Sequence, residues 1–228
     1  MSGETTVPRI IAAAIAAAAM ILGSAGCGAQ PAGRSPGASQ YKPITVVHAT
    51  GVSAAWPYFG TEVNPPLPKP DWTLTDTGGA AYDIPARTRG RITVLFFGYT
   101  SCADDCPTMM ADVAAALRTV PAAVAKQVTV LFVTVDPAYD RGPRLSAWLA
   151  RFYPSFVGLS APDATVIHDA GELGIPVQPP KKVDGVDSVQ HGNETEVFNQ
   201  SGYANFFWGP TTPVLDIAHD LKQLTTTS

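Results

Sequence analysis

Hydrophobic positions from Trp72 onwards follow two patterns that alternate along the chain. Unbroken apolar runs at Ile92–Phe97 and Val128–Val135 predict strands that are buried on both faces of a sheet. After each run, apolar residues recur at the spacing of the buried face of a helix. The alternation predicts an α/β protein with a central mixed sheet flanked by helices.

Weaker patterns give approximate bounds for the remaining elements. Short strands are expected at Trp72–Leu74, Phe156–Leu159, Glu196–Phe198 and Asn205–Trp208. Helices are expected at Cys106–Val120, Pro143–Phe152, between Ser160 and Leu173, and at Pro213–Leu224. The stretch Tyr41–Pro70 has no clear pattern, except that the proline-rich residues at its end must be extended. We therefore expect the folded domain to span residues 65–228.

The N-terminal residues have the pattern of an export signal. Arg9 precedes a short apolar run, Ile10–Leu22, and small residues follow it directly before Cys27. The run is shorter than the roughly 20 residues that span a membrane. Small residues before a lone cysteine also resemble a bacterial lipobox, with Ser24 standing where an aliphatic residue is usual. In that arrangement Cys27 would be the lipid-modified first residue of the mature chain.

This pattern predicts a lipoprotein-type signal peptide at residues 1–26. Residues 27–64 are then a lipid-anchored tether with an irregular N-terminal extension, because Gly28–Gln40 is rich in proline, glycine and serine, as flexible linkers are. Plain secretion and a retained anchor helix are the two alternatives. All three place the domain outside the cytoplasm, and we expect it in a bacterial cell envelope, lipid-anchored to the outer face of the cytoplasmic membrane.

Composition and charge exclude several classes of function. Hydrophobic residues make up 46% of the chain and charged residues 15%, so wholesale disorder is excluded. Lys and Arg number 15 against 19 Asp and Glu, which gives a net charge of −4. Since the chain has no large basic cluster, nucleic-acid binding is excluded as well. Three cysteines are too few for a scaffold built on disulfides.

Cys102 and Cys106 form a C-x3-C pair directly after the predicted strand Ile92–Phe97 and at the start of the next helix. Reaction sites gather at this junction in open α/β sheets, and a helix N-terminus favours thiolate over thiol. The pair is therefore a redox couple or a soft metal site, with two buried structural thiols as the third interpretation. The spacing differs from the C-x2-C of thioredoxin-type exchange and lets both sulfurs face one point about 2.3 Å away.

A metal ion held by two thiolates needs a further ligand, and the chain offers four histidines for it. His168 and His219 are expected to be solvated residues on helices, and His48 is expected to be structural. His191 precedes Gly192 in a polar loop that enters a late strand. Its position alone leaves open whether it binds a metal ion.

Three segments resemble the Sco/SenC family of copper-binding proteins over roughly Pro66 to Leu224. They are Phe97–Pro107 (FGYTSCADDCP), Val135–Asp140 (VDPAYD), and Val189–His191 with Gly202 eleven residues further on. Ala103 stands where this family usually has proline, and Gln190 stands where it commonly has aspartate beside the histidine. Such a carboxylate tunes or orients a ligating imidazole, so copper affinity or redox behaviour is expected to differ here.

The resemblance implies a thioredoxin-like fold in which Cys102, Cys106 and His191 bind copper as Cu(I) or Cu(II). It also implies delivery of the metal to the dinuclear copper site in the copper-bearing subunit of cytochrome c oxidase. Ligand chemistry agrees, because soft thiolates select Cu(I) and imidazole accepts either oxidation state.

Two enzymatic alternatives to the copper chaperone are considered. In the first, the Cys102/Cys106 pair is catalytic and reduces cysteines of a partner as a thiol-disulfide oxidoreductase. In the second, the chain is a thiol peroxidase, which is disfavoured because Tyr99 stands where peroxiredoxins have threonine.

Aspartates accompany both motifs. Asp104 and Asp105 lie between the cysteines, either as a negative rim that attracts a cation or a basic partner, or as solvated loop carboxylates. Asp136 and Asp140 are expected first to be turn or helix-capping residues.

Overall fold

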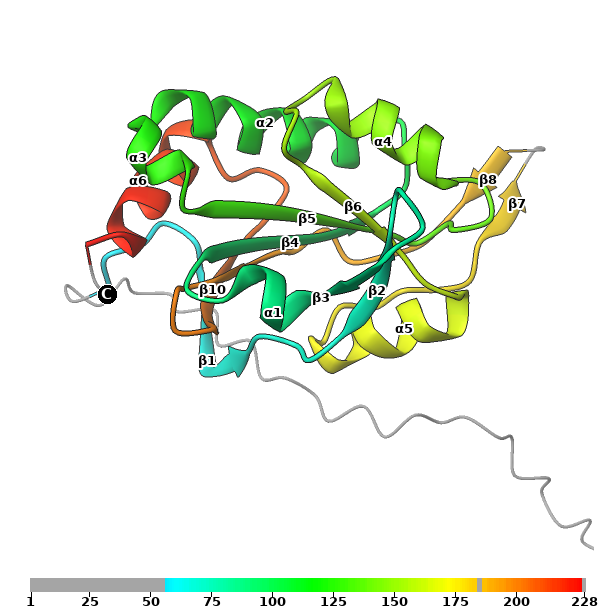
Figure 1. Ribbon diagram of the computed structural model, residues 1–228, viewed down its shortest axis with the longest axis horizontal. Helices are drawn as coiled ribbons and strands as arrows, with labels where there is room; N and C mark the ends of the chain where they lie inside the picture. The colour runs from blue at the N-terminus through cyan, green and yellow to red at the C-terminus, as the bar shows by residue number, and fades with distance from the viewer. Residues whose placement is uncertain (1–55, 184–185, 227–228) are drawn as a thin grey trace, which may run out of the picture. The chain divides into compact units, whose positions relative to one another are not determined.

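The computed structural model of the chain describes residues 56–183 and 186–226. The predicted signal peptide, Cys27 and His48 lie outside these residues. In the described part, an eight-stranded mixed sheet carries helices on both faces, which is a thioredoxin-like arrangement (Figure 1). No helix among the described residues is long and apolar enough to cross a membrane.

The central sheet has the strand order β1-β10-β9-β4-β5-β6-β2-β3. These strands are β1 (Thr61–Pro68), β2 (Thr73–Asp76), β3 (Ala81–Asp83), β4 (Ile92–Gly98), β5 (Val128–Thr134), β6 (Val157–Ser160), β9 (Thr195–Phe198) and β10 (Tyr203–Trp208). The pairs β4–β5 and β5–β6 are parallel and the others are antiparallel. The carboxyl ends of β4, β5 and β6 therefore meet at one edge. A separate hairpin pairs β7 (Lys181–Val183) with β8 (Val186–Ser188).

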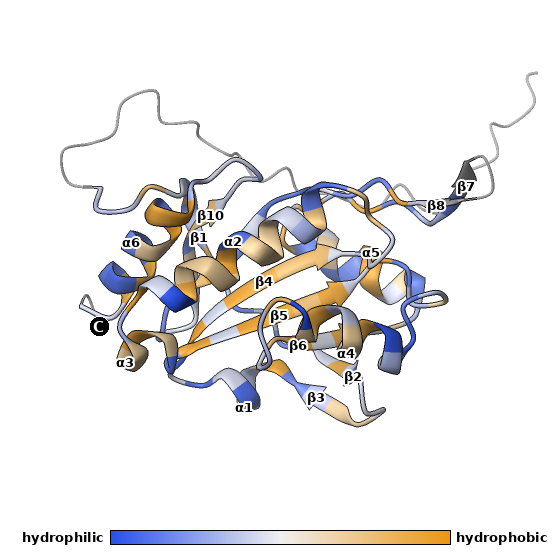
Figure 2. Cartoon of the chain, turned by 90° about the horizontal axis from the view of Figure 1, so that it is seen from above, coloured by the Kyte–Doolittle hydropathy of each residue, from blue (hydrophilic) through white to orange (hydrophobic). Residues whose placement is uncertain are grey.

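Helices on the two faces of the sheet enclose two hydrophobic cores. The helices are α1 (Ile84–Thr88), α2 (Asp105–Thr119), α3 (Ala122–Ala125), α4 (Gly142–Ala150), α5 (Asp163–Glu172) and α6 (Val214–Leu224). One core packs α2, α4 and α6 on the sheet, and the other packs α1 and α5 on it. Every residue of β4 is buried, because Val94 and Phe96 face the first core while Leu95 and Phe97 face the second. Figure 2 shows β4 and β5 as the hydrophobic centre of the sheet.

The strands and helices predicted from the pattern are confirmed within a few residues. Sequence analysis missed β1, β3, β7, β8 and the short helices α1 and α3. In β1 (TEVNPPLP) the prolines hide the strand signal. They are tolerated because β1 lies at the edge of the sheet, pairs only with β10, and shifts register between Glu62 and Leu67. Packed structure begins before residue 65, since Trp56 and Tyr58 also contact the first core.

Asp220 of α6 forms hydrogen bonds with the segment that leads into β1. Its carboxylate accepts hydrogen bonds from the backbone N–H groups of Phe59 (2.8 Å) and Gly60 (3.0 Å). The indole Nε1 of the buried Trp208 also donates to it, at 3.0 Å. This network ties the beginning of the described chain to its last helix.

Candidate metal centre

Cys102 and Cys106 lie where β4 passes into α2, at the carboxyl edge of the parallel strands. Cys106 is buried in the first turn of α2, and Cys102 is half-buried in the preceding loop. Gly98 ends β4 at a point where a side chain would not fit. A Cβ there would lie 2.9 Å from Cys106 Sγ and 2.7 Å from a ring carbon of Phe96. The glycine therefore makes room for the buried thiol.

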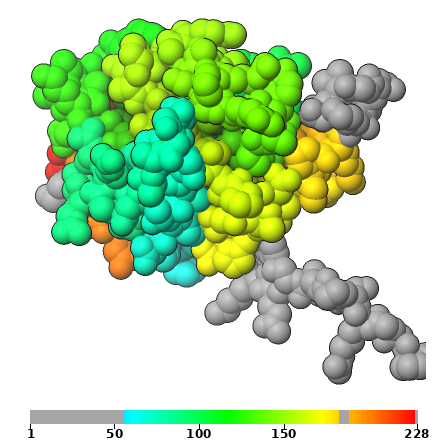
Figure 3. Space-filling model, turned by 45° about the vertical axis from the view of Figure 1, so that its right-hand side comes forward, coloured from blue at the N-terminus to red at the C-terminus, as the bar shows by residue number. Residues whose placement is uncertain are grey.

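His191 reaches this place because its backbone is bound to the segment that follows α5. His191 forms an antiparallel bridge with Val177, and on either side Gln178 N–H donates to Gln190 O and Gly192 N–H to Pro176 O, both at 2.8 Å. The gold segment with β7 and β8, which precedes His191, lies beside α5 in Figure 3. As a result, His191 Nε2 lies 3.8 Å from Cys106 Sγ, although the two residues are 85 positions apart.

The His191 ring is oriented with Nε2 towards the Cys106 thiol. Its Nδ1 lies 2.7 Å from the carbonyl oxygen of Gly192. A carbonyl can only accept, so Nδ1 carries a proton in this hydrogen bond, and Nε2 is the ring nitrogen that faces the sulfur. The rings of Phe96 and Tyr99 meet the imidazole edge-on at centroid distances of 6.2 and 5.8 Å. With Nδ1–H held by a carbonyl, Nε2 is the ring nitrogen that is placed to coordinate a metal ion.

The His191 loop is also joined to α2 directly. Asn193 donates a hydrogen bond of 2.6 Å from Nδ2 to Asp105 Oδ2, in the first turn of that helix. Asp104 is exposed and makes no capping hydrogen bond with its side chain, which agrees with a solvated loop carboxylate. The two aspartates of the C-x3-C segment therefore have different roles, because only Asp105 contacts the loop of His191.

The pKa values of the two thiols are shifted in opposite directions. The pKa of Cys102 is lowered, chiefly because the Cys106 thiol donates a hydrogen bond to it and despite the opposing effect of burial. Backbone N–H groups at the start of α2 contribute in the same direction. The same hydrogen bond, together with burial, raises the pKa of Cys106. At neutral pH the pair therefore holds one proton on Cys106, and the half-buried Cys102 is the thiolate.

The donor atoms brought together here suit a soft metal ion. His191 Nε2 lies 3.8 Å from Cys106 Sγ, and Cys102 precedes Cys106 by four positions, so this part of the chain carries two sulfurs and one imidazole nitrogen. Sulfur ligands favour Cu(I) and zinc, and imidazole accepts both oxidation states of copper. The residues present therefore fit a copper ion.

Asp140 lies beside the cysteine loop, and sequence analysis expected it first to be a turn or helix-capping residue. Its buried carboxylate accepts hydrogen bonds from Thr134 Oγ1 (2.7 Å), from Thr100 N–H (2.9 Å) and from Thr100 Oγ1. It therefore fixes the start of the loop that carries Cys102. Asp136 is a turn residue as predicted, because its carbonyl accepts from the backbone N–H groups of Tyr139 and Asp140. The spacing of the two aspartates after β5 was the available signal, but it does not identify Thr100 as the partner.

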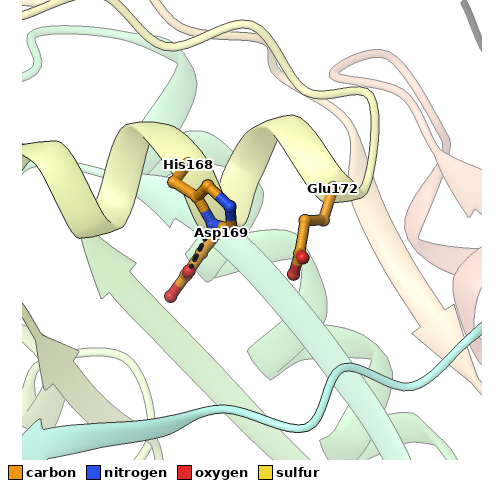
Figure 4. A group of neighbouring side chains, drawn as sticks. All are labelled: His168, Asp169 and Glu172. Atoms are coloured by element: carbon orange, nitrogen blue, oxygen red, sulfur yellow. Dashed lines mark hydrogen bonds and ion pairs between the residues drawn. The ribbon is translucent and has the colours of Figure 1, made fainter. Parts of the chain in front are cut away.

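A second group of potential metal ligands lies on α5, away from the cysteines. Single ligand atoms of His168, Asp169 and Glu172 lie within 4.8 Å of one another (Figure 4). The His168 side chain is 71% exposed, as expected for a solvated helix residue, and its Nδ1 lies 3.3 Å from Asp169. Glu172 accepts a hydrogen bond of 2.8 Å from Trp72 Nε1. His219 contacts Asp220 and lies in neither group.

A protein family and several solved structures match the described part of the chain. The family model described as SCO1/SenC matches residues 62–226. The structure of ScoI from Bradyrhizobium japonicum with copper bound is 26% identical, with a TM-score of 0.61, and the match covers 69% of this chain and 99% of that one. The solution structure of apo Sco1 from Thermus thermophilus is 28% identical, with a TM-score of 0.66, over 75% of this chain and 99% of that one.

Curated relatives match over a shorter stretch. A relative from Stutzerimonas stutzeri, named for copper binding, is 30% identical over 114 residues, which are 50% of this chain and 56% of its own length. The chain thus spans about half the length of this relative. The family model covers most of the chain and nearly all of its described residues. The chain therefore belongs to the SCO1/SenC family.

Proposed function

We propose that the chain is a copper chaperone that holds one copper ion through Cys102, Cys106 and His191. The observation that carries this proposal is the 3.8 Å approach of His191 Nε2 to Cys106 Sγ, with the ring proton held on the other nitrogen by the Gly192 carbonyl. A copper-bound structure of the related Bradyrhizobium protein supports copper as the metal. The metal is cargo here, so the site must bind it and also release it.

The donor set is suited to holding copper in either oxidation state. Two thiolates neutralise Cu(II) and leave one net negative charge with Cu(I), so neither state places a large uncompensated charge in the site. Cys102 is half-buried whereas Cys106 is buried, so a recipient can approach the metal from the Cys102 side. A site with three ligands also leaves room for a ligand from the recipient.

The proposed recipient is the dinuclear copper site of cytochrome c oxidase, which the family resemblance implies. Lipid attachment at Cys27 and the tether that follows would hold the domain at the outer face of the cytoplasmic membrane. There it would meet the part of a membrane-bound oxidase that faces the same compartment.

Copper stoichiometry tests the ligand set. We expect the chain from Gly28 onwards to bind one copper ion per molecule, with absorption bands from thiolate ligands. The variants Cys102→Ser, Cys106→Ser and His191→Ala should each lose most of this binding, because each removes one of three donors. His168→Ala is the matched control and should bind as the wild type does. Unchanged binding by His191→Ala would contradict the proposal.

A thiol-disulfide oxidoreductase is the second candidate, and the acidity of Cys102 favours it. The Cys102 thiolate would attack a partner disulfide, and one partner sulfur would leave as a thiolate. Cys106 would then displace the second partner sulfur and give up its proton. The partner gains two electrons, and Cys102 and Cys106 end as a disulfide. His191→Ala separates the two functions, since dithiol exchange does not need the imidazole as a ligand.

A further inference from the structure

A pocket beside the cysteine loop is not used by the metal site. It has a volume of about 490 Å³ and is lined by Thr100, Tyr139, Arg144, Ala147, Trp148 and Arg151. Most of these residues belong to α4 or to the turn before it. Thr100 precedes Cys102 by two positions, so the pocket adjoins the loop that carries the more accessible thiol of the pair.

The pocket combines an aromatic lining with two available cations. Tyr139 is 40% exposed, and Trp148 is nearly buried. The Arg144 guanidinium lies 4.1 Å from the centre of the Tyr139 ring, and its Nη1 donates to the tyrosine hydroxyl at 3.1 Å. Among the residues that the structure describes, neither Arg144 nor Arg151 forms an ion pair with a carboxylate. By contrast, Arg118 on α2 donates to the Phe152 carbonyl and is thus part of the fold.

These residue types suit a protein partner that carries acidic side chains. Trp, Tyr and Arg are the residues that most often dominate the binding energy of protein interfaces. Two arginines without acidic partners, in a chain whose net charge is −4, form a local positive site that complements a carboxylate. Arg144 is already positioned by Tyr139, so little side-chain freedom is lost when a carboxylate binds to it.

The pocket and the metal site are held together through Asp140. This buried residue directly follows Tyr139 in the chain and binds both Thr100 N–H and Thr100 Oγ1. A partner that contacts the pocket is therefore placed at a defined position relative to Cys102. We infer that the Tyr139–Arg144–Arg151 pocket is the docking site for an acidic protein surface of the partner that receives the copper. This inference rests on the proposed chaperone function.

Charge reversal on α4 tests the inference. The full chain in detergent is loaded with copper and mixed with the copper-free soluble domain of the copper-bearing subunit of a bacterial cytochrome c oxidase. We expect Arg144→Glu/Arg151→Glu to bind copper as the wild type does but to transfer it about tenfold more slowly at low ionic strength. The difference should shrink at about 0.3 M salt. Arg144→Lys/Arg151→Lys keeps the charge but loses the stacking on Tyr139, so its rate should lie between those of the wild type and the charge-reversed variant.

The matched control is Arg87→Glu/Arg89→Glu, which changes the net charge by the same amount at the amino end of β4. Both residues are exposed, and Arg87 stacks on Tyr82 much as Arg144 stacks on Tyr139. Equal transfer rates for the wild type and Arg144→Glu/Arg151→Glu would overturn the docking site and leave the copper site intact. An equal loss in the control would overturn it too. A wild-type chain that takes up no copper would instead overturn the proposed function, and the docking inference with it.

Discussion

Two buried aspartates hold two different segments of this molecule by the same kind of hydrogen bond. Asp140 is 1% exposed and binds the loop that leads to Cys102, whereas Asp220 is 0% exposed and binds the segment that leads into β1. Each carboxylate accepts from backbone N–H groups or neighbouring side chains. Hydrogen bonds to a charged acceptor are stronger than those between neutral groups, so both segments are firmly held.

The two regions differ in what surrounds the donors. Gly60 and Trp208, which donate to Asp220, are buried, so these two donors have no water to replace the carboxylate, while the third donor belongs to the exposed Phe59. Thr100, which donates twice to Asp140, is half-buried and can reach water more easily, whereas the third donor, the Thr134 hydroxyl, is buried. Hydrogen bonds of the same kind are therefore expected to stabilise the fold at Asp220 and to position the cysteine loop at Asp140. We expect removal of Asp220 to destabilise the fold and removal of Asp140 to disturb the metal site.

The largest expected effect is that of Asp220→Ala on stability. It leaves two backbone N–H groups and a buried indole N–H without their acceptor, so the free energy of unfolding should fall by about 3–5 kcal/mol. Urea titration followed by tryptophan fluorescence measures this loss. Copper affinity of the folded fraction should stay within about twofold of the wild type. A strong loss of affinity with unchanged stability would contradict the assignment of Asp220 to the fold.

Glu196 on β9 differs from Asp140 and Asp220, because its buried carboxyl group has few hydrogen-bond donors around it. It is 3% exposed and its Oε2 has no hydrogen-bond partner. Burial and the charge of Glu194 raise the pKa of Glu196 to about 8. The folded state therefore binds more protons than the unfolded state between about pH 4.5 and pH 8, and stability falls as pH rises through this range.

Glu196→Gln removes the titrating group and should remove this part of the pH dependence. Relative to the wild type, the variant should gain about 2–4 kcal/mol of unfolding free energy between pH 5 and pH 8. Urea titrations of both proteins at pH 5, 6.5 and 8 measure the difference. Parallel stability curves for the two proteins would show that Glu196 is not held neutral by its surroundings.

Elements with a local signal could be predicted from the sequence. β4 and β5 are continuous apolar runs, and a run of this kind can be recognised without its neighbours. The position of Cys102 and Cys106 at a strand-to-helix junction follows from the same local pattern. β1 could not be recognised, because its prolines are acceptable only at a sheet edge, and edge position depends on strands far away in the chain.

The contacts that build the site depend on pairing between distant segments. His191 meets Cys106 only because its backbone is bound to Val177 and Pro176, and no local pattern encodes that pairing. The family resemblance suggested the histidine, but position alone left it open. Asp140 was assigned to a turn, since its acceptor role depends on Thr100, 40 residues upstream. The close packing at Gly98 was missed for the same reason.

Asp140→Ala should affect the metal site more than the fold. Thr100 N–H loses its acceptor, so the loop can move and Cys102 is no longer held in one position. Groups that orient metal ligands typically contribute 10-fold to 100-fold to affinity, and we expect about a tenfold loss of copper affinity here. Competition with a copper chelator measures it. The free energy of unfolding should fall by about 1–2 kcal/mol, less than for Asp220→Ala, because Thr100 can bind water and only the buried Thr134 hydroxyl is left without this acceptor. A larger stability loss than for Asp220→Ala would break the comparison between the two aspartates.

The smallest expected effect concerns Asn193, which joins the His191 loop to α2 through Asp105. The hydrogen bond of 2.6 Å lies between half-buried side chains, so Asn193→Ala should weaken copper binding only about twofold to fivefold. Asn193→Asp should weaken it more, because two carboxylates would then repel each other and push the imidazole away from the thiols. Asn199→Ala, in the turn between β9 and β10, is the matched control and should leave affinity unchanged. If Asn193→Asp binds copper as tightly as Asn193→Ala, the loop is positioned by its backbone contacts with Val177 and Pro176 alone.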